Sequence, residues 1–119
     1  WRYNTEWKPI AGFPIFAGWF RSIHRAHAEV ARGLSIKCPV LVMHARRSSW
    51  PKQWTADAMR TDVVLDVADI ARLAPGLGPQ VSLVAIEDGM HDLVLSQPAV
   101  RAGVFAELKA WLVALGGAR

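Results

Sequence analysis

A continuous apolar run at residues 38–45, CPVLVMHA, is the feature that most restricts the fold of this chain. The run has a proline near its start and no polar alternation, a pattern typical of a parallel strand buried on both faces. Residues 81–86, VSLVAI, form a second strand-like run, and a helical pattern at 67–74 separates the two. Because parallel strands need a crossover connection, these three segments predict an α/β fold with a parallel sheet.

Two further helices are predicted on either side of this unit. Residues 18–32 place apolar side chains at helical spacing, and Gly33 suits the end of that helix. The second helix covers residues 97–115, with Ser96 as its N-cap and a proline in its first turn. Its expected apolar stripe comprises Val100, Val104, Leu108, Trp111, Leu112 and Leu115.

The remaining segments lack a regular period. Residues 1–17 carry two prolines and five aromatic side chains, which predicts an irregular, lid-like or cap-like arm. Residues 46–61 are polar apart from two tryptophans and predict a long loop at the carboxyl end of the first strand. Long loops in this position often carry function.

Composition narrows the class of partner and the compartment. The formal net charge is +4, but the basic residues are scattered, so no nucleic acid partner is expected. A single cysteine, Cys38, excludes an internal disulfide framework and favours a reducing, cytoplasmic location. No apolar run approaches the roughly 18 residues of a transmembrane segment, and no signal peptide is visible. The chain begins at Trp1 rather than Met, so we expect a processed or partial chain.

Three of the four histidines have ordinary structural interpretations. His24 and His27 share one helix face, but no nearby carboxylate or cysteine completes a metal site, so no metal is expected there. His44 ends the first strand, where we expect a histidine whose hydrogen bonds are satisfied.

The fourth histidine has a different setting, because His91 lies in the turn EDGMHDL directly after the second strand. Asp62 follows the first strand and its loop, and the carboxyl ends of parallel strands meet at one edge of a sheet. An aspartate bonded to one imidazole nitrogen fixes the tautomer and stabilises the imidazolium when the other nitrogen takes a proton. The pair therefore predicts the acid–base half of a nucleophilic hydrolase. A capping aspartate and a turn histidine are the structural alternative.

Three motifs together resemble the carboxyl-terminal half of α/β-hydrolases, from about residue 7 to residue 115. They are residues 38–44 (CPVLVMH) before the acid, 62–66 (DVVLD) at the acid turn and 89–93 (GMHDL) at the histidine turn. The final helix, with FAELKAWL, is similar too. The chain looks most like the monoglyceride lipase or serine aminopeptidase-like branch, including bacterial esterase and lysophospholipase types. The resemblance implies a partial α/β-hydrolase fold, with the end of a cap at 1–35 and core at 36–119.

By that resemblance, His91 is the general base and Asp62 the triad acid, with Asp66 next and Asp57 weaker. The acid usually follows its strand closely, whereas residues 45–61 intervene here. The family also needs a Gly-x-Ser-x-Gly elbow that exposes its serine nucleophile. The 119 residues contain no such motif and lack the early oxyanion-hole segment. The serines without the flanking glycines are Ser22, Ser35, Ser48, Ser49, Ser82 and Ser96.

The resemblance implies a serine hydrolase that acts on a carboxylic ester, such as a small-molecule or lysophospholipid-like substrate. The nucleophile and the oxyanion hole would come from the missing amino-terminal half of the fold. No metal or organic cofactor is implied, and the 119-residue chain alone is expected to be inactive. The alternative of another class is a non-catalytic α/β fragment that acts as an interaction module through its aromatic surface.

Overall fold

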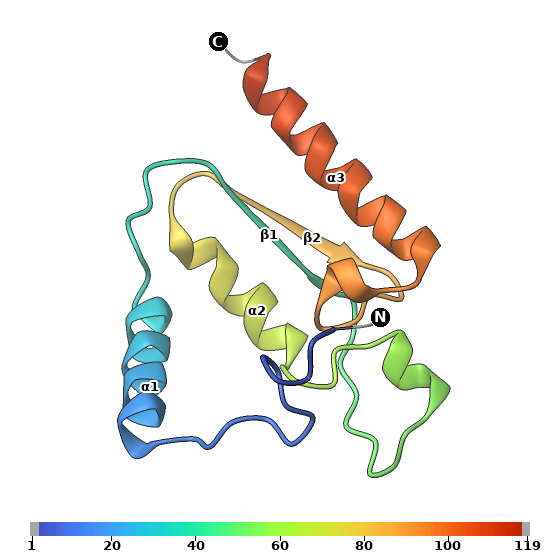
Figure 1. The fold of residues 1–119 in the computed structure, drawn as a ribbon. Coiled ribbons are helices and arrows are strands. Elements are labelled where there is room, and N and C mark those ends of the chain that lie inside the picture. Colours follow the sequence, from blue (N-terminus) through green and yellow to red (C-terminus); the bar gives the residue numbers. More distant parts are fainter. Residues whose placement is uncertain (1–2, 118–119) are drawn as a thin grey trace.

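The computed structural model describes residues 3–117, which form one parallel sheet with helices around it (Figure 1). The elements in chain order are α1 (Ala17–Ala31), β1 (Val40–Ala45), α2 (Val67–Leu73), β2 (Val81–Ile86) and α3 (Pro98–Gly116). Short 3₁₀ helices add η1 (Ala56–Met59), η2 (Ala74–Leu77) and η3 (Leu93–Leu95). The predicted combination of parallel strands and helices is confirmed. Within the described residues, none of the helices has the length and apolar character required to cross a membrane.

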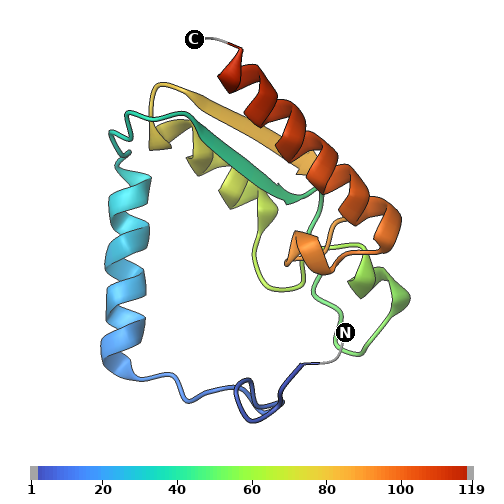
Figure 2. The ribbon, with the colours of Figure 1, turned by 45° about the horizontal axis from the view of Figure 1, so that its top comes forward.

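The sheet consists of β1 and β2, paired in parallel from Val40↔Val81 to Ala45↔Ile86. Side chains alternate across a strand, so Ser82, Val84 and Ile86 share one face. The Trp111 Nε1–H of α3 donates to Ser82 Oγ at 3.1 Å, which places α3 on that face. On the opposite face, Val42 lines a cleft with residues of α2. The two strands therefore lie between α2 and α3 (Figure 2).

The buried core is small for a chain of this mass. Its buried apolar members are Ala45, Val67, Ala74, Ile86 and Val104. The accessible surface is 9205 Å², whereas a compact monomer of this mass exposes about 6,400 Å². The radius of gyration is 16.5 Å, compared with about 13.5 Å for a compact domain of this length. The structure thus leaves apolar surface open that a compact domain would bury.

Much of the open surface lies on the amino-terminal part of the chain. Residues 3–16 form an irregular arm, as predicted, and α1 stands to one side of the sheet in both views (Figures 1 and 2). A cleft of about 440 Å³ separates α1 from α2, with His27 and Val30 on one wall and Ile70 and Leu73 on the other. The exposed large apolar side chains here are Tyr3, Trp7, Ile10, Phe13, Ile15, Phe16, Trp19 and Phe20.

Helix α3 departs from its prediction in two respects. Val104 is buried, but Leu108 and Leu112 of the expected stripe are exposed. Because α3 is apolar around most of its circumference, the spacing alone does not show which face meets the sheet. The N-cap residue is Gln97, with no side-chain capping bond in the described structure, so the prediction of Ser96 as cap is wrong. The Ser96 hydroxyl instead accepts a hydrogen bond from the Met90 N–H.

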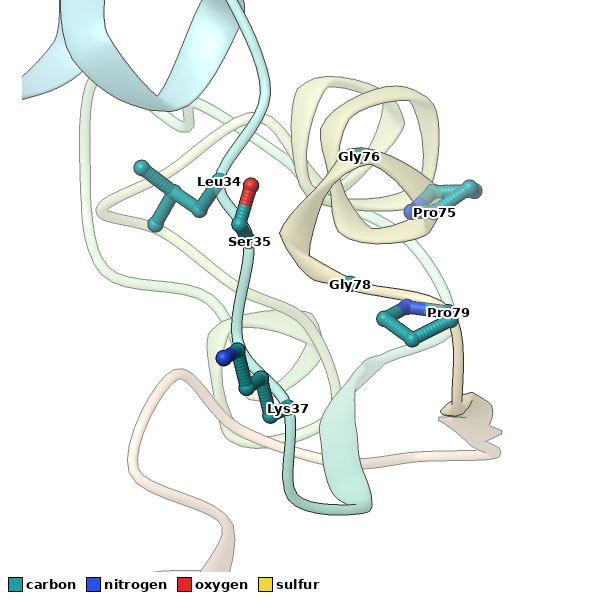
Figure 3. A pocket seen from close by; sticks show the side chains of 7 residues that line it. All are labelled: Leu34, Ser35, Lys37, Pro75, Gly76, Gly78 and Pro79. Atoms are coloured by element: carbon teal, nitrogen blue, oxygen red, sulfur yellow. The ribbon is translucent and has the colours of Figure 1, made fainter.

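The connection from α1 to β1 is held against η2 by main-chain hydrogen bonds. The Leu34 N–H donates to the Gly76 carbonyl at 2.7 Å, and the Ile36 N–H donates to the Leu77 carbonyl at 3.0 Å. The two segments flank a shallow hollow (Figure 3). A Cβ atom at Gly78 would collide with the Ile36 carbonyl, so this close approach requires glycine.

We predict that Gly78→Ala lowers the free energy of unfolding by about 1–3 kcal/mol, because two main-chain segments must separate to admit the methyl group. Gly103→Ala is the matched control, since a Cβ there meets nothing within 4 Å. That change is expected to stabilise α3 by up to about 1 kcal/mol. Urea denaturation followed by tryptophan fluorescence measures both, and equal effects of the two variants would contradict the close approach at Gly78.

Candidate acid–base site

Asp62 lies beside the end of β1 although residues 46–61 intervene in the sequence. An isolated parallel bridge pairs Ser48 with Asp62. The Asp62 N–H donates to the Arg47 carbonyl at 3.0 Å, and the Ser49 N–H donates to the Asp62 carbonyl at 2.9 Å. The long segment therefore leaves the sheet and returns, which gives Asp62 a position close to the strand end.

Side chains close the base of this loop. Arg47 donates two hydrogen bonds to the Asp57 carboxylate, at 2.9 and 2.6 Å. The Thr61 hydroxyl donates to the Asp57 carbonyl at 3.0 Å and bonds to Ser49 Oγ at 2.7 Å. Asp57, a weaker candidate for the triad acid, is thus paired with arginine in the loop.

The acid turn after Asp62 is folded around its own carboxylate and one serine. Asp62 Oδ1 accepts from the N–H groups of Val64 and Leu65, both at 2.8 Å. Ser48 Oγ donates to the Leu65 carbonyl and accepts from the Val67 N–H. Asp66 caps α2, where its side chain accepts from the Ala68 N–H at 2.9 Å. Asp66, the next candidate for the triad acid, therefore has a structural role as the cap of α2.

The second oxygen of Asp62 contacts the histidine of the other turn. His91 Nδ1 and Asp62 Oδ2 are 2.9 Å apart, the contact expected from the sequence. The Asp62 side chain is only 3% exposed, whereas the His91 side chain is 41% exposed. The carboxylate is enclosed, while the imidazole is partly open to solvent.

The pKa of Asp62 determines which of the two side chains carries the proton of their hydrogen bond. Burial by itself raises the pKa of the Asp62 carboxyl. Hydrogen bonds from the Leu65 N–H, from His91 and from the Val64 N–H together outweigh burial and hold that pKa below its ordinary value. The ionised carboxylate can only accept, so His91 Nδ1 carries the proton. His91 Nε2 is then the nitrogen that can exchange a proton with a reactant.

The histidine turn is shaped by close packing and a left-handed residue. Asp88 has φ 55°, a region that aspartate enters more readily than most residues. Gly89 lies so close to Ala45 and Leu93 that a Cβ atom would be 2.8 Å from a Leu93 methyl carbon. The Met90 N–H donates to the buried Ser96 Oγ at 3.0 Å. The main chain on both sides of His91 is therefore restrained.

The other histidines lie outside this site. His24 packs against the Phe20 ring in α1, with 4.8 Å between ring centroids. His44 is buried, and its Nδ1 lies 2.6 Å from the Ala45 carbonyl. Its Nε2 has no partner among the described residues, so the prediction of a fully satisfied histidine is wrong. Residues 3–117 contain no group of three or more potential metal ligands.

Several hydroxyl groups that could have served as a nucleophile have structural partners. In the described residues, Ser22 donates to the Gly18 carbonyl, and Ser82 accepts from Trp111. Ser48, Ser49 and Ser96 stabilise the two turns, and none of the hydrogen bonds of these five serines involves His91.

The hollow in Figure 3 lies before the strands begin, at the opposite end of the sheet from His91.

Sequence reasoning anticipated the Asp62–His91 pair but missed the residues that support it. Ser48 and Thr61 lie in the segment predicted as a loop, and Ser96 is predicted as a helix cap. Their roles depend on which segments the folded loop brings together, and no local spacing signals that. One partial signal existed, because Asp88-Gly89 is a turn dipeptide separated from His91 by one residue.

The chain matches no protein-family model, and neither a curated protein nor a solved structure is significantly similar to it.

We predict that Asp62→Asn lowers the free energy of unfolding near pH 7 by about 1–3 kcal/mol, because a neutral amide replaces the charged acceptor of the bonds from two main-chain N–H groups and His91. The folded pKa of Asp62 lies below its unfolded value of about 3.9, so the contribution of the carboxylate is complete above that value. It is lost as the pH falls through the lower folded value. The difference between wild type and variant should therefore shrink below about pH 4.

Urea denaturation at a series of pH values measures this difference. Asp66→Asn is the control, because asparagine caps a helix as well as aspartate does, and its effect should stay within about 0.5 kcal/mol. A difference for Asp62→Asn that grows as the pH falls would contradict the assignment.

Proposed function

We propose that Asp62 and His91 are the acid and the general base of a serine hydrolase that cleaves ester bonds. The observation that carries the proposal is the contact between a buried carboxylate and a half-exposed imidazole at the carboxyl ends of two parallel strands. Sites in open α/β sheets form at that edge. The resemblance of the three motifs to α/β-hydrolases supports a partial α/β-hydrolase fold and a carboxylic ester, including a lysophospholipid-like ester, as substrate.

The proposed chemistry needs a serine hydroxyl placed against His91 Nε2 from outside these 119 residues. As the serine oxygen attacks the ester carbonyl, its proton passes to Nε2, and Asp62 stabilises the imidazolium. The imidazolium then gives that proton to the departing alcohol oxygen and leaves an acyl-serine. Water deprotonated by the same nitrogen releases the acid and restores the serine. Each step uses His91 Nε2, the nitrogen that the Asp62 contact leaves available.

We predict that the coding DNA upstream of the Trp1 codon continues in frame through a strand pattern followed by Gly-x-Ser-x-Gly. In a protein that includes this extension, Asp62→Asn should lower kcat/KM for p-nitrophenyl esters by about 10⁴-fold. His91→Ala should lower it at least as far, because the members of a triad act as a unit.

Asp66→Asn is the matched control, and we expect it to retain activity because its side chain caps α2. An Asp66 variant as impaired as the Asp62 variant would reassign the acid. An upstream sequence that ends at a stop codon, or continues without the serine motif, would contradict the proposed function.

The isolated 119-residue chain should not react with a fluorophosphonate probe, because the five serines with described partners are bonded away from His91. Gel fluorescence after incubation with the probe measures labelling, and a full-length serine hydrolase serves as the positive control. Labelling of this chain that disappears in His91→Ala would show a nucleophile within these residues.

The exposed apolar surface favours a second candidate function, an interaction module without catalysis. Trp7, Trp50 and Trp54 are exposed, as is the outer face of α3. A module held by such surfaces would self-associate or bind a protein partner. Light scattering of the isolated chain tests self-association. A chain that stays monomeric at high concentration would argue against a self-associating module.

A further inference from the structure

We propose that Arg60 is a positioning residue whose ion pair with Asp88 ties the acid turn to the histidine turn and keeps His91 directed at Asp62. The catalytic consequence of this link rests on the proposed function. The link itself concerns geometry that the chain shows on its own.

The two residues stand next to the two members of the acid–base pair. Arg60 precedes Asp62 by one intervening residue, and Asp88 lies shortly before His91 on the other turn. Arg60 Nη2 donates to Asp88 Oδ2 at 2.5 Å. In the described residues, this bond and the Asp62–His91 bond are the side-chain hydrogen bonds that join residues 60–62 to residues 88–91.

A single hydrogen bond leaves the His91 ring free to turn, because the ring is 41% exposed and water competes for Nδ1. A second tie between the same two turns restricts that motion. It acts at Asp88, whose left-handed backbone sets the direction in which the chain enters Gly89 and reaches His91. Asp88 in this region persists because its surroundings hold it. The guanidinium group of Arg60 is a charged partner that helps to hold Asp88 in this conformation.

The Arg60–Asp88 pair is suited to positioning rather than to overall stability. The Arg60 side chain is 56% exposed, and exposed ion pairs add little to the free energy of folding. The neighbouring Arg46–Glu87 pair is also an ion pair on the same turn and is more exposed, at 62% and 69%, but it reaches back to the end of β1 instead of to the acid turn. It therefore offers a matched control within the chain.

The test is the tautomer of His91 in the 119-residue chain, measured by long-range ¹H–¹⁵N correlation spectra of the imidazoles above the pH at which the ring loses its extra proton. Wild type should show the Nδ1–H form, and Asp62→Asn should abolish that preference. Asp88→Asn removes the charge and retains a residue that accepts positive φ, so the turn should stay folded. Amide spectra check the fold of each variant.

In Asp88→Asn and Arg60→Ala, we expect the ratio of Nδ1–H to Nε2–H forms to fall by at least about two-fold, the lower end of coupling within one network. Arg60→Lys, which keeps the charge, should recover part of the loss. Glu87→Gln should leave the ratio at its wild-type value. If Arg60 had only a general structural role, lysine at this position would not restore the tautomer ratio in a chain whose amide spectra are unchanged.

The outcomes separate the two proposals. Wild type without the Nδ1–H form, or an Asp62→Asn variant indistinguishable from it, overturns the acid–base pair and the proposed function with it. A wild-type Nδ1–H form that persists in both Asp88→Asn and Arg60→Ala overturns only the positioning role of Arg60. An equal shift in Glu87→Gln also overturns that role, because any ion pair on the turn would then serve.

Discussion

The parallel pairing of β1 with β2 is the constraint on which the rest of the structure depends. In this register Ala45 and Ile86 lie opposite one another, so both strands end at the same level. The Ile86 carbonyl accepts from the Arg46 N–H and from the Gly89 N–H, which starts the acid loop and the histidine turn at one point. A slip of the register by one residue would turn every side chain to the other face and separate the two turns.

The long loop between β1 and Asp62 does not disturb this arrangement because it is closed at its base. The Ser48–Asp62 bridge and the Arg47–Asp57 pair return the chain to the strand end. Entropy of loop closure grows slowly with length, so residues 50–60 add little cost once the base is paired. The sequence distance between strand and acid is therefore a poor guide to their distance in space.

The difference between distance in sequence and distance in space explains which features of the fold and the site were predictable from the sequence. The strands and helices were predictable because their apolar runs and periods are set locally. His91 was singled out because it follows a strand and Asp62 because it follows a strand and its loop, and both turns resemble those of α/β-hydrolases. The hydrogen bonds of Ser48 and the Arg60–Asp88 pair were not predicted, since their partners are distant in sequence. The bond of Ser96 to the Met90 N–H depends on how the turn between them folds. The exposed faces at Leu108 and Leu112 were missed for a related reason. A helix that is apolar around most of its circumference does not reveal which neighbour covers each face.

Asp62 is buried and His91 is partly exposed, and this difference determines what each side chain can do chemically. If both side chains were buried, the imidazolium would form at a high desolvation cost, and no reactant could reach Nε2. If both were exposed, water would replace the carboxylate at Nδ1 and the tautomer would no longer be fixed. An enclosed carboxylate held by two main-chain N–H groups, beside an open imidazole, avoids both failures. In the proposed mechanism, Asp62 therefore orients and stabilises the imidazole, while His91 alone moves the proton.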